Sequence, residues 1–342
     1  MSEQTKIAWC DSTINWWEGC TKVSAGCQHC YAEARDKRFT GGKLWGKGAP
    51  RRKSKSAVKD ALRYNKLPWI CDECGHAPKD AIDSVALCEK CNRVVSCHPR
   101  RIFSLSLGDW LDAEVPIEWL AEMLDTIRQC DQVTWILCSK RWENFEKRIS
   151  DVVAYDCANR GNEPVNGKNL STWLINWINE PYQNIIGLCS VENQEMADSR
   201  IAQFLSVPLA CRGLSLEPLL GPVDVAPYLL REGKLDFKKM PNGGDGIPYP
   251  WRGIDWVIVG GESGANAREF NMAWGAQLIK QGKAAGVATF FKQAGANSFR
   301  EIPDIGRGIG WLKQPSNFKD KKGGDINELP EMFRVQEWPK GF

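Results

Sequence analysis

The sequence has few histidines and no long apolar run, and each shortage argues against a class of protein. Only three histidines occur in 342 residues, which disfavours a hydrolase built on a mononuclear, histidine-ligated zinc or iron. No apolar stretch approaches the ~20 residues that span a bilayer. The first residues, MSEQTKIAWCDS, lack the apolar core of a secretory signal. We therefore expect a cytoplasmic protein that does not bind a membrane.

Two common catalytic motifs are also missing. Gly41, Gly42, Gly46 and Gly48 lie close together, but no Gly-Lys-Ser/Thr follows them, so they do not form a phosphate-binding P-loop. No serine nucleophile elbow is visible in the sequence. The sequence thus offers no nucleotide-phosphate loop and no serine hydrolase site.

Cysteine, tryptophan and clustered positive charge are what the sequence has in excess. In a cytosolic chain, most of the 14 cysteines are expected to be thiols or metal ligands rather than disulfides. Many of the 16 tryptophans must lie in the core, and the others are candidates for stacking surfaces. Residues 35–101 hold 17 Lys+Arg against 7 Asp+Glu, although the whole chain carries a net charge of only +3. This basic segment suggests a site for a polyanion, and a solvated, mobile insertion is the alternative.

From residue 102 onward, short apolar runs alternate with amphipathic helical segments such as 116–129 and 273–285. The runs have the length of buried parallel strands and lie at residues 102–106, 133–138, 185–189, 213–216, 256–259 and 287–291. A further strand is expected near residues 14–16. This alternation predicts an α/β fold with a parallel sheet, as a partial or full (β/α) barrel, and an open sheet is the alternative.

Charged residues follow these runs within a few positions. They are Asp109, Lys140, Arg141, Glu192, Glu217, Glu262 and Lys292. Active sites of barrels and open α/β sheets lie at the carboxyl ends of the strands. Any strand leaves the core through polar residues, but a charge at that place is costly unless it is paired or used. The pattern favours a functional site at this end of the sheet.

Two CxxC pairs form the first candidate metal site. Cys71, Cys74, Cys88 and Cys91 lie in the segment CDECGHAPKDAIDSVALCEKC. Four thiolates from two such knuckles are the ligands that structural Zn²⁺ prefers, so we predict a zinc ribbon. A rubredoxin-like iron or an auxiliary iron–sulfur cluster is the alternative, since both also take four cysteines.

Three further cysteines form the second candidate site. Cys20, Cys27 and Cys30 lie in the segment WWEGCTKVSAGCQHCYA, after a short apolar strand and before a helical run. A [4Fe–4S] cluster held by three cysteines keeps one iron open for a substrate or cofactor. A zinc site completed by His29 or Cys10 is the alternative.

A three-cysteine loop at the top of the first strand of a parallel barrel resembles the radical SAM enzymes, whose usual motif is C-x3-C-x2-C. The first gap here has six residues, and His29 stands where an aromatic residue commonly packs near the adenine. The blocks KIAWCDSTINWWEGCTKVSAGCQHCYAE, SVENQEMADSRI, LSLEPLLGPVDV and DWVIVGGESG…FFKQAG resemble the phage Gp37/Gp68 family, which consists of DUF5131-type three-cysteine proteins. This resemblance covers nearly the whole chain outside about 50–100.

The resemblance implies a barrel of radical SAM type with an inserted zinc ribbon. It implies that Cys20, Cys27 and Cys30 ligate three irons of a [4Fe–4S] cluster, and that the fourth iron chelates S-adenosylmethionine. An external donor such as a flavodoxin or ferredoxin would reduce the cluster, which passes one electron to the sulfonium. A C–S bond then breaks to give methionine and a 5′-deoxyadenosyl radical, which takes a hydrogen atom from the substrate.

The roles of the strand-end residues follow from the same resemblance. Asp109 stands where the family's element for the cofactor ammonium is expected. The expected cofactor-binding residues are His29, Asp109, Glu192 and Glu262. The expected catalytic residues are Lys140, Glu192 and Glu217. Arg141 and Lys292 could neutralise a carboxylate or a phosphate.

The basic segment beside a zinc ribbon points to nucleic acid, and DNA in particular, as the substrate. Trp45, Trp69 and Trp110 are candidates for stacking a flipped or single-stranded base. For a phage-encoded protein in a bacterial host, we expect an isomerase- or transferase-like radical enzyme of the thymine hypermodification type. One alternative is a zinc-containing nucleic-acid-binding or hydrolytic protein without redox chemistry. Another is an iron–sulfur cluster that serves structure or redox sensing without S-adenosylmethionine.

The expected domain organisation has three parts. Residues 1–49 and 102–311 form the barrel with its cluster loop, residues 50–101 form the basic segment and zinc-ribbon insertion, and residues 312–342 form a tail that packs on the barrel. The sequence leaves the oligomeric state and the reacting substrate atom open.

Overall fold

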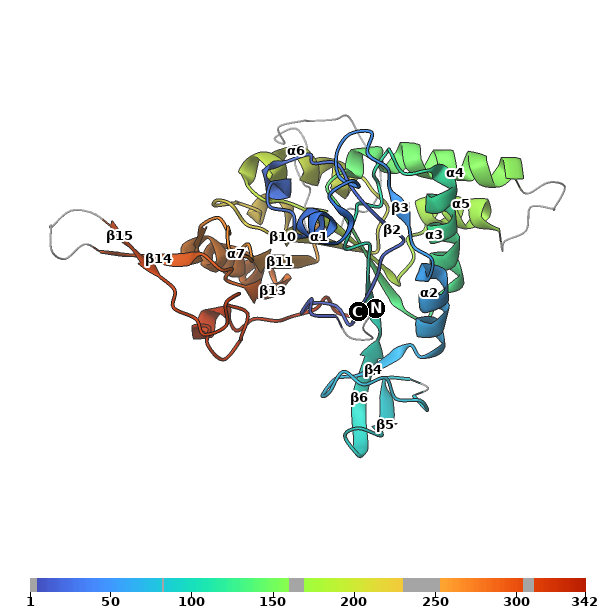
Figure 1. Cartoon of the computed structure of the whole chain (residues 1–342). Helices are drawn as coiled ribbons and strands as arrows, with labels where there is room; N and C mark the ends of the chain where they lie inside the picture. The colour runs from blue at the N-terminus through green and yellow to red at the C-terminus, as the bar shows by residue number, and fades with distance from the viewer. Residues whose placement is uncertain (1–4, 82, 160–168, 230–252, 304–310) are drawn as a thin grey trace.

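The structure, a computed structural model, describes residues 5–81, 83–159, 169–229, 253–303 and 311–342. Its centre is a sheet of seven parallel strands that curls into an open half barrel (Figure 1). The strands follow one another across the sheet in chain order: β1 (Ser12–Ile14), β7 (Arg101–Ser104), β8 (Thr134–Ser139), β9 (Ile185–Ser190), β10 (Cys211–Leu216), β11 (Trp256–Gly260) and β13 (Ala288–Gln293). Strands β1 and β13 are the two edges of this sheet.

The mixed α/β class and the seven strands predicted from the sequence are confirmed. Their apolar runs are continuous because both faces of the sheet are covered. The first strand, β1, ends at Ile14, where the sequence placed its beginning. Trp16 and Trp17 follow it and are buried in the core. Because they are apolar, the strand was predicted too far along the chain.

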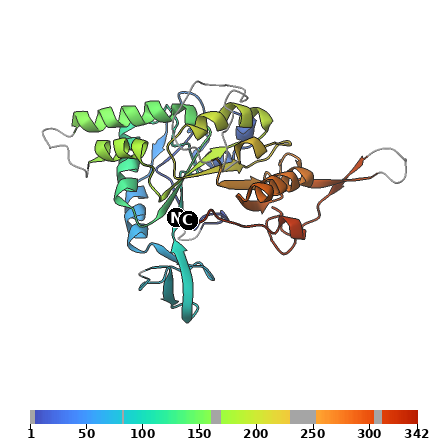
Figure 2. The same ribbon diagram turned by 180° about the vertical axis from the view of Figure 1, so that it is seen from behind.

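Helices cover the convex face of the half barrel (Figures 1 and 2). They are α2 (Ala57–Lys66), α3 (Ile117–Gln129), α4 (Phe145–Asn159), α5 (Leu170–Asn179), α6 (Gln194–Leu205) and α7 (Met272–Ala285). Alternate strand residues point to this side, such as Trp135 and Leu137 of β8, and they join the helices in one large core. Short 3-10 turns are η1 (Ala25–Cys27), η2 (Trp142–Asn144), η3 (Ala226–Tyr228) and η5 (Glu331–Phe333).

The concave face has its own apolar core. The intervening strand residues, such as Ile136 of β8 and Phe290 of β13, pack there with Trp9. Trp338, near the carboxyl terminus, closes this core and donates a hydrogen bond from Nε1 to the Trp9 carbonyl at 3.2 Å. The two termini therefore meet at the half barrel (Figure 1).

A small antiparallel sheet, formed by chain that lies between β1 and β7 in the sequence, projects away from the half barrel (Figure 1). Its strand order is β4 (Trp69–Cys71), β6 (Arg93–Pro99), β5 (Val85–Cys88). We call residues 69–99 the ribbon. The rest of the predicted insertion belongs to the body, because β3 (Arg52–Lys53) pairs with β2 (Trp17–Glu18) and α2 packs into the main core.

A second projection lies on the side opposite α4 and α5 (Figures 1 and 2). It is the antiparallel hairpin of β14 (Ser298–Pro303) and β15 (Trp311–Pro315), which joins β12 (Phe270–Asn271) in a three-stranded sheet. Strand β15 spans the boundary that the sequence placed between the barrel and its tail. Across the described ranges, no helix has the length and apolar character needed to cross a bilayer.

Candidate functional site

The loop of residues 20–30, which we call the three-cysteine loop, lies across the carboxyl ends of the central strands. It runs from β2 through η1 to α1 (Tyr31–Thr40). After β8, Arg141 donates from Nη2 to Cys20 Sγ at 3.4 Å. After β9, Glu192 accepts a hydrogen bond from Ser24 Oγ at 3.1 Å. The loop is thus fixed to two neighbouring strand ends.

The loop also approaches Glu192 so closely that one residue must be glycine. A Cβ atom built on Gly26 would stand 2.3 Å from Glu192 Cγ and 2.4 Å from its Oε1. No heavier residue fits there unless the loop or the carboxylate moves.

A third strand end holds the far side of the loop. After β11, Glu262 Oε2 lies 3.1 Å from His29 Nδ1. Arg268 binds both oxygens of Glu262, at 2.6 and 3.0 Å, and also donates to the Ala25 carbonyl at 2.7 Å. Burial alone would raise the pKa of Glu262, but the hydrogen bonds and charge of Arg268 hold it below its ordinary value. Two of the predicted cofactor-binding residues, His29 and Glu262, are therefore brought together.

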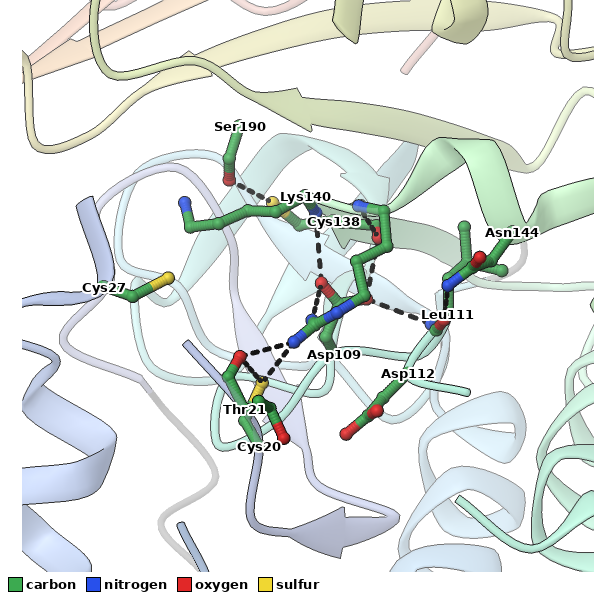
Figure 3. A network of polar contacts seen from close by, with 12 residues as sticks. Cys20, Thr21, Cys27, Asp109, Leu111, Asp112, Cys138, Lys140, Asn144 and Ser190 are labelled. Carbon is green, nitrogen blue, oxygen red and sulfur yellow. Dashed lines mark hydrogen bonds and ion pairs between the residues drawn. The ribbon is translucent and has the colours of Figure 1, made fainter. Parts of the chain in front are cut away.

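Donors from the protein take the hydrogen-bond acceptor positions of the Asp109 carboxylate (Figure 3). It accepts from Ser139 Oγ at 2.7 Å, from Arg141 Nη1 at 2.8 Å, and from the backbone N–H groups of Lys140 and Leu111, both at 3.0 Å. A carboxylate offers about four acceptor positions. The placement therefore differs from the expected contact with a cofactor ammonium, and Asp109 instead orients Arg141 toward Cys20.

The thiols of the loop lie in an enclosed, cation-rich setting. Burial raises the pKa of the Cys20 thiol to about 12, although the neighbouring Arg141 opposes this shift. Burial also raises the pKa of Cys30, while backbone N–H groups at the start of α1 favour its thiolate. Lys140 lies near Cys27 (Figure 3). Thiolates in such a place are stabilised by a bound metal group together with these cations.

The thiols of the three-cysteine loop are more widely spaced than those of a gathered metal site. The three sulfurs do not gather within 4.8 Å of one another, alone or with a histidine or a further cysteine, among the residues that the structure describes. A single zinc draws its ligands together, whereas the cysteines of a cubane cluster bind different irons and stand further apart.

Lys140 and Glu192 form a buried ion pair beneath the loop. Lys140 Nζ lies 2.5 Å from Glu192 Oε1, and Arg200 Nη1 lies 3.0 Å from Oε2. Glu192 is fully buried. Burial would raise its pKa, but the charges of Lys140 and Arg200 outweigh that effect and keep the pKa below its ordinary value. The carboxylate is thus held ionised against the loop.

A second pair lies further along the concave wall. Lys292 Nζ, near the end of β13, lies 2.7 Å from Glu217 Oε1, just after β10. Trp9 donates from Nε1 to the other oxygen of Glu217 at 3.1 Å. Strand alternation places both side chains on the concave face, like Lys140 and Glu192. We call the strand ends that carry Lys140, Glu192, Glu217, Glu262 and Lys292 the mouth.

Comparison with known proteins identifies the family of the chain. A family model described as "Protein of unknown function (DUF5131)" matches residues 4–328. The chain belongs to this family. No curated protein and no solved structure matches it. The DUF5131 membership accounts for the resemblance over nearly the whole chain, and it carries no statement of chemistry.

The four-cysteine site of this DUF5131 chain has the geometry of a metal centre. Cys71 Sγ lies 3.8 Å from Cys91 Sγ, and Cys74 Sγ lies 3.7 Å from Cys88 Sγ. All four sulfurs lie within 4.8 Å of one another. Four Zn–S bonds of about 2.3 Å in a tetrahedron separate sulfurs by about 3.8 Å. The four cysteines could therefore hold one metal ion such as zinc, and they are too close for the ligands of a multi-iron cluster.

Each knuckle of the ribbon ends in a left-handed residue. Gly75 follows the first CxxC pair with φ 67°, and Asn92 follows the second with φ 54°. Glycine and asparagine are the residues that adopt this conformation most easily. The Cys91 backbone N–H points at Cys88 Sγ at 3.5 Å, which favours a thiolate ligand.

Several residues of the site escaped the sequence analysis. Ser24 and Arg268 fix the three-cysteine loop, and Arg200 neutralises Glu192. Arg200 lies eight residues after Glu192, two helical turns into α6, and this spacing could have revealed it. Trp110 was wrongly predicted as a stacking residue, because it is fully buried beside Trp142.

Several cations of residues 35–101 pair with groups of the protein itself. The Arg51 side chain is almost fully buried and pairs with Asp112 at 2.9 Å. Lys53 pairs with Glu122 at 2.7 Å. Arg101 is buried and stacks on Trp338. Much of this positive charge therefore connects elements of the protein.

Proposed function

We propose that this DUF5131 chain is a radical-SAM-like enzyme that modifies a nucleic-acid base. The three-cysteine loop would hold a [4Fe–4S] cluster, and its open iron would bind S-adenosylmethionine at the mouth of a radical-SAM-type half barrel. The supporting observation is the position of the loop, which lies across the carboxyl ends of β8, β9 and β11 with its thiols beside Arg141 and Lys140. The setting we propose is a phage-encoded protein acting in the cytoplasm of its bacterial host.

The bound cofactors would supply a hydrogen-abstracting radical once an external donor, such as a flavodoxin or ferredoxin, delivers an electron. The chain itself would supply charge, orientation and a dry wall. Arg141 and Lys140 place positive charge beside the ligand thiolates. Glu217 and Lys292 would offer a polar pair to a substrate, beside the apolar core of the concave face.

The first experiment is metal analysis of protein purified without oxygen. We expect about four iron atoms, with sulfide, and about one zinc per chain. The reduced sample should give an EPR signal that changes when S-adenosylmethionine is added. Replacing Cys20, Cys27 and Cys30 together by alanine should remove the iron and leave the zinc. Cys157→Ser, at an exposed cysteine outside both sites, is the control and should keep both metals.

Two outcomes would overturn this proposal. About two zinc and no iron would favour a zinc-containing nucleic-acid-binding or hydrolytic protein without redox chemistry, for which the four-cysteine site could hold one of the two ions. If iron is present but its EPR signal does not change when S-adenosylmethionine is added, a cluster used for structure or redox sensing is favoured. The substrate class is tested separately, and the absence of binding to DNA or RNA at low salt would exclude it.

A further inference from the structure

The β14–β15 hairpin carries the most exposed large apolar side chain among the described residues. Trp311 is 69% exposed, and its neighbour Leu312 is 48% exposed. We call residues 298–303 and 311–322, which form this hairpin and the loop after it, the arm. The hairpin projects from the body of the molecule (Figures 1 and 2). Its exposed tryptophan offers a flat ring to a binding partner.

The arm is positively charged. Its cations are Arg300, Lys313, Lys319, Lys321 and Lys322, against the acids Glu301 and Asp320. Lys313 pairs with Glu269 at 2.6 Å. Lys319, Lys321 and Lys322 are exposed, and none of them forms an ion pair with a described carboxylate. These lysines differ in this respect from Arg51 and Lys53, which are paired within the protein.

The base of the arm is attached to the mouth. The Gly295 N–H donates to the Lys322 carbonyl at 2.9 Å, and the Ala296 N–H donates to the Glu262 carbonyl at 2.8 Å. Glu262 in turn contacts His29 of the three-cysteine loop. The lysines therefore lie next to the strand end that holds this loop.

We propose that the arm binds single-stranded nucleic acid, with a base stacked on Trp311 and phosphates contacted by Lys319, Lys321 and Lys322. Base–aromatic stacking combined with a basic track is the usual mode of sequence-tolerant single-strand binding. A single strand fits because chemistry on a base requires that base to leave the duplex stack. The inference rests on the proposed nucleic-acid substrate and names the surface that would hold it.

A protein partner fits the arm less well. The arm has an excess of positive charge, and its exposed apolar area consists chiefly of one ring and one leucine. Interfaces between copies of a chain are larger and depleted of lysine at their centre. The charge of the arm is complementary to phosphate.

The test is fluorescence anisotropy of a fluorescein-labelled single-stranded DNA of mixed sequence, titrated with the full-length, metal-loaded protein. Trp311→Ala should weaken binding about tenfold, because stacking of one base is lost. The triple variant Lys319→Gln, Lys321→Gln, Lys322→Gln should reduce the log–log salt slope by about 2, at about 0.7 per phosphate contact. Each variant should keep the melting temperature and iron content of the wild type.

Matched controls lie on the opposite side of the molecule. Ile175→Ala removes an exposed apolar side chain from α5, and Lys147→Gln removes an exposed cation from α4. Both should bind the single strand like the wild type.

Three results would overturn the inference. If the arm variants bind normally while Lys90→Gln with Arg93→Gln on the ribbon does not, the strand binds the ribbon and the proposed function stands. If Trp311→Ala instead converts a dimer to a monomer, the arm is an interface between copies. If the wild type binds no nucleic acid at low salt, the inference and the proposed substrate class fail together, while the iron count and EPR still test the cofactors.

Discussion

Glu192 is the most enclosed charge of the mouth, and its surroundings show how this end of the sheet is held together. Its carboxylate accepts from the three-cysteine loop through Ser24 and is paired with Lys140 and Arg200 from two further elements. A buried charge that lost these partners would be strongly destabilising. The residue therefore fixes the loop to β8, β9 and α6 at once.

The first prediction concerns Glu192→Gln. Because the folded-state pKa lies below the ordinary value of 4.5, the carboxylate stabilises the fold above that pH and the contribution is lost as pH falls through the folded-state pKa. At pH 7 we expect the variant to lose about 3 kcal/mol in free energy of unfolding, because two buried cations lose their partner. The difference from wild type should shrink toward pH 4 and below.

Urea unfolding of both proteins across that pH range is the measurement. Glu143→Gln, at an exposed glutamate, is the matched control and should change stability by less than about 0.5 kcal/mol at every pH. A difference for Glu192→Gln that stays constant with pH would contradict the ionised, paired state.

A second prediction tests the close approach at Gly26. In Gly26→Ala the new methyl group would overlap Glu192, so the loop must shift away from the mouth. We expect a loss of about 1–3 kcal/mol in stability and reduced iron per chain after anaerobic purification. Gly221→Ala is the control, because a Cβ there meets nothing within 4 Å. Equal iron content in both variants would show that iron binding does not depend on the close approach of Gly26 to Glu192.

At the residue scale, the sequence located the charges but not their pairing. Lys140, Glu192, Glu217 and Lys292 were predictable at strand ends, because each follows an apolar run. Their partners come from distant parts of the chain, as Ser24 does for Glu192, and local patterns carry no information about such contacts. The filled carboxylate of Asp109 escaped prediction for the same reason.

At the scale of elements, the ribbon and the half barrel have separate cores. The ribbon core consists of Cys71, Ala86, Cys88, Val95 and Cys97, with a few partly buried neighbours. So small a core cannot hold a fold without a further link, and a metal ion bound by the four cysteines would supply that link. The half barrel has no such need, because its helices and strands share one large core.

Cys74→Ser tests this separation. We expect the variant to lose one zinc per chain and to show fast amide exchange over residues 69–99, while β7, β8 and β9 stay protected. Cys157→Ser is the matched control and should keep both the zinc and the protection pattern. Loss of protection throughout the half barrel would mean that the two cores fold as one unit.

Elements differ in how far their sequence predicts them. The seven sheet strands were predictable because strands buried on both faces are continuous apolar runs. The β14–β15 hairpin was not, because its exposed strand β15, WLKQP, mixes apolar and polar residues without a core-facing pattern. The ribbon followed from cysteine spacing, because tetrahedral ligation restricts where four thiols can stand.

For the whole molecule, the open sheet raises the question of what protects its edge and its concave core. Residues 335–337 run alongside β13, and the Phe291 N–H donates to the Val335 carbonyl at 2.8 Å. This segment covers an edge strand that would otherwise present unpaired backbone groups. It also carries Trp338 onto the concave core, where the ring packs 5.0 Å from that of Phe290.

Trp338→Ala tests whether the carboxyl-terminal segment completes the half barrel. The ring packs on Phe290, lies under the Arg101 guanidinium and donates to the Trp9 carbonyl. Its removal should lower the free energy of unfolding by about 3 kcal/mol and increase binding of an apolar fluorescent dye, because the concave core opens to water. The matched control is Trp311→Ala, at the exposed tryptophan of the arm, which should change stability by less than about 0.5 kcal/mol. Equal, small effects of the two substitutions would mean that the half barrel closes its concave core without this segment. The strand ends at the mouth would then keep their positions through the three-cysteine loop and the helices alone.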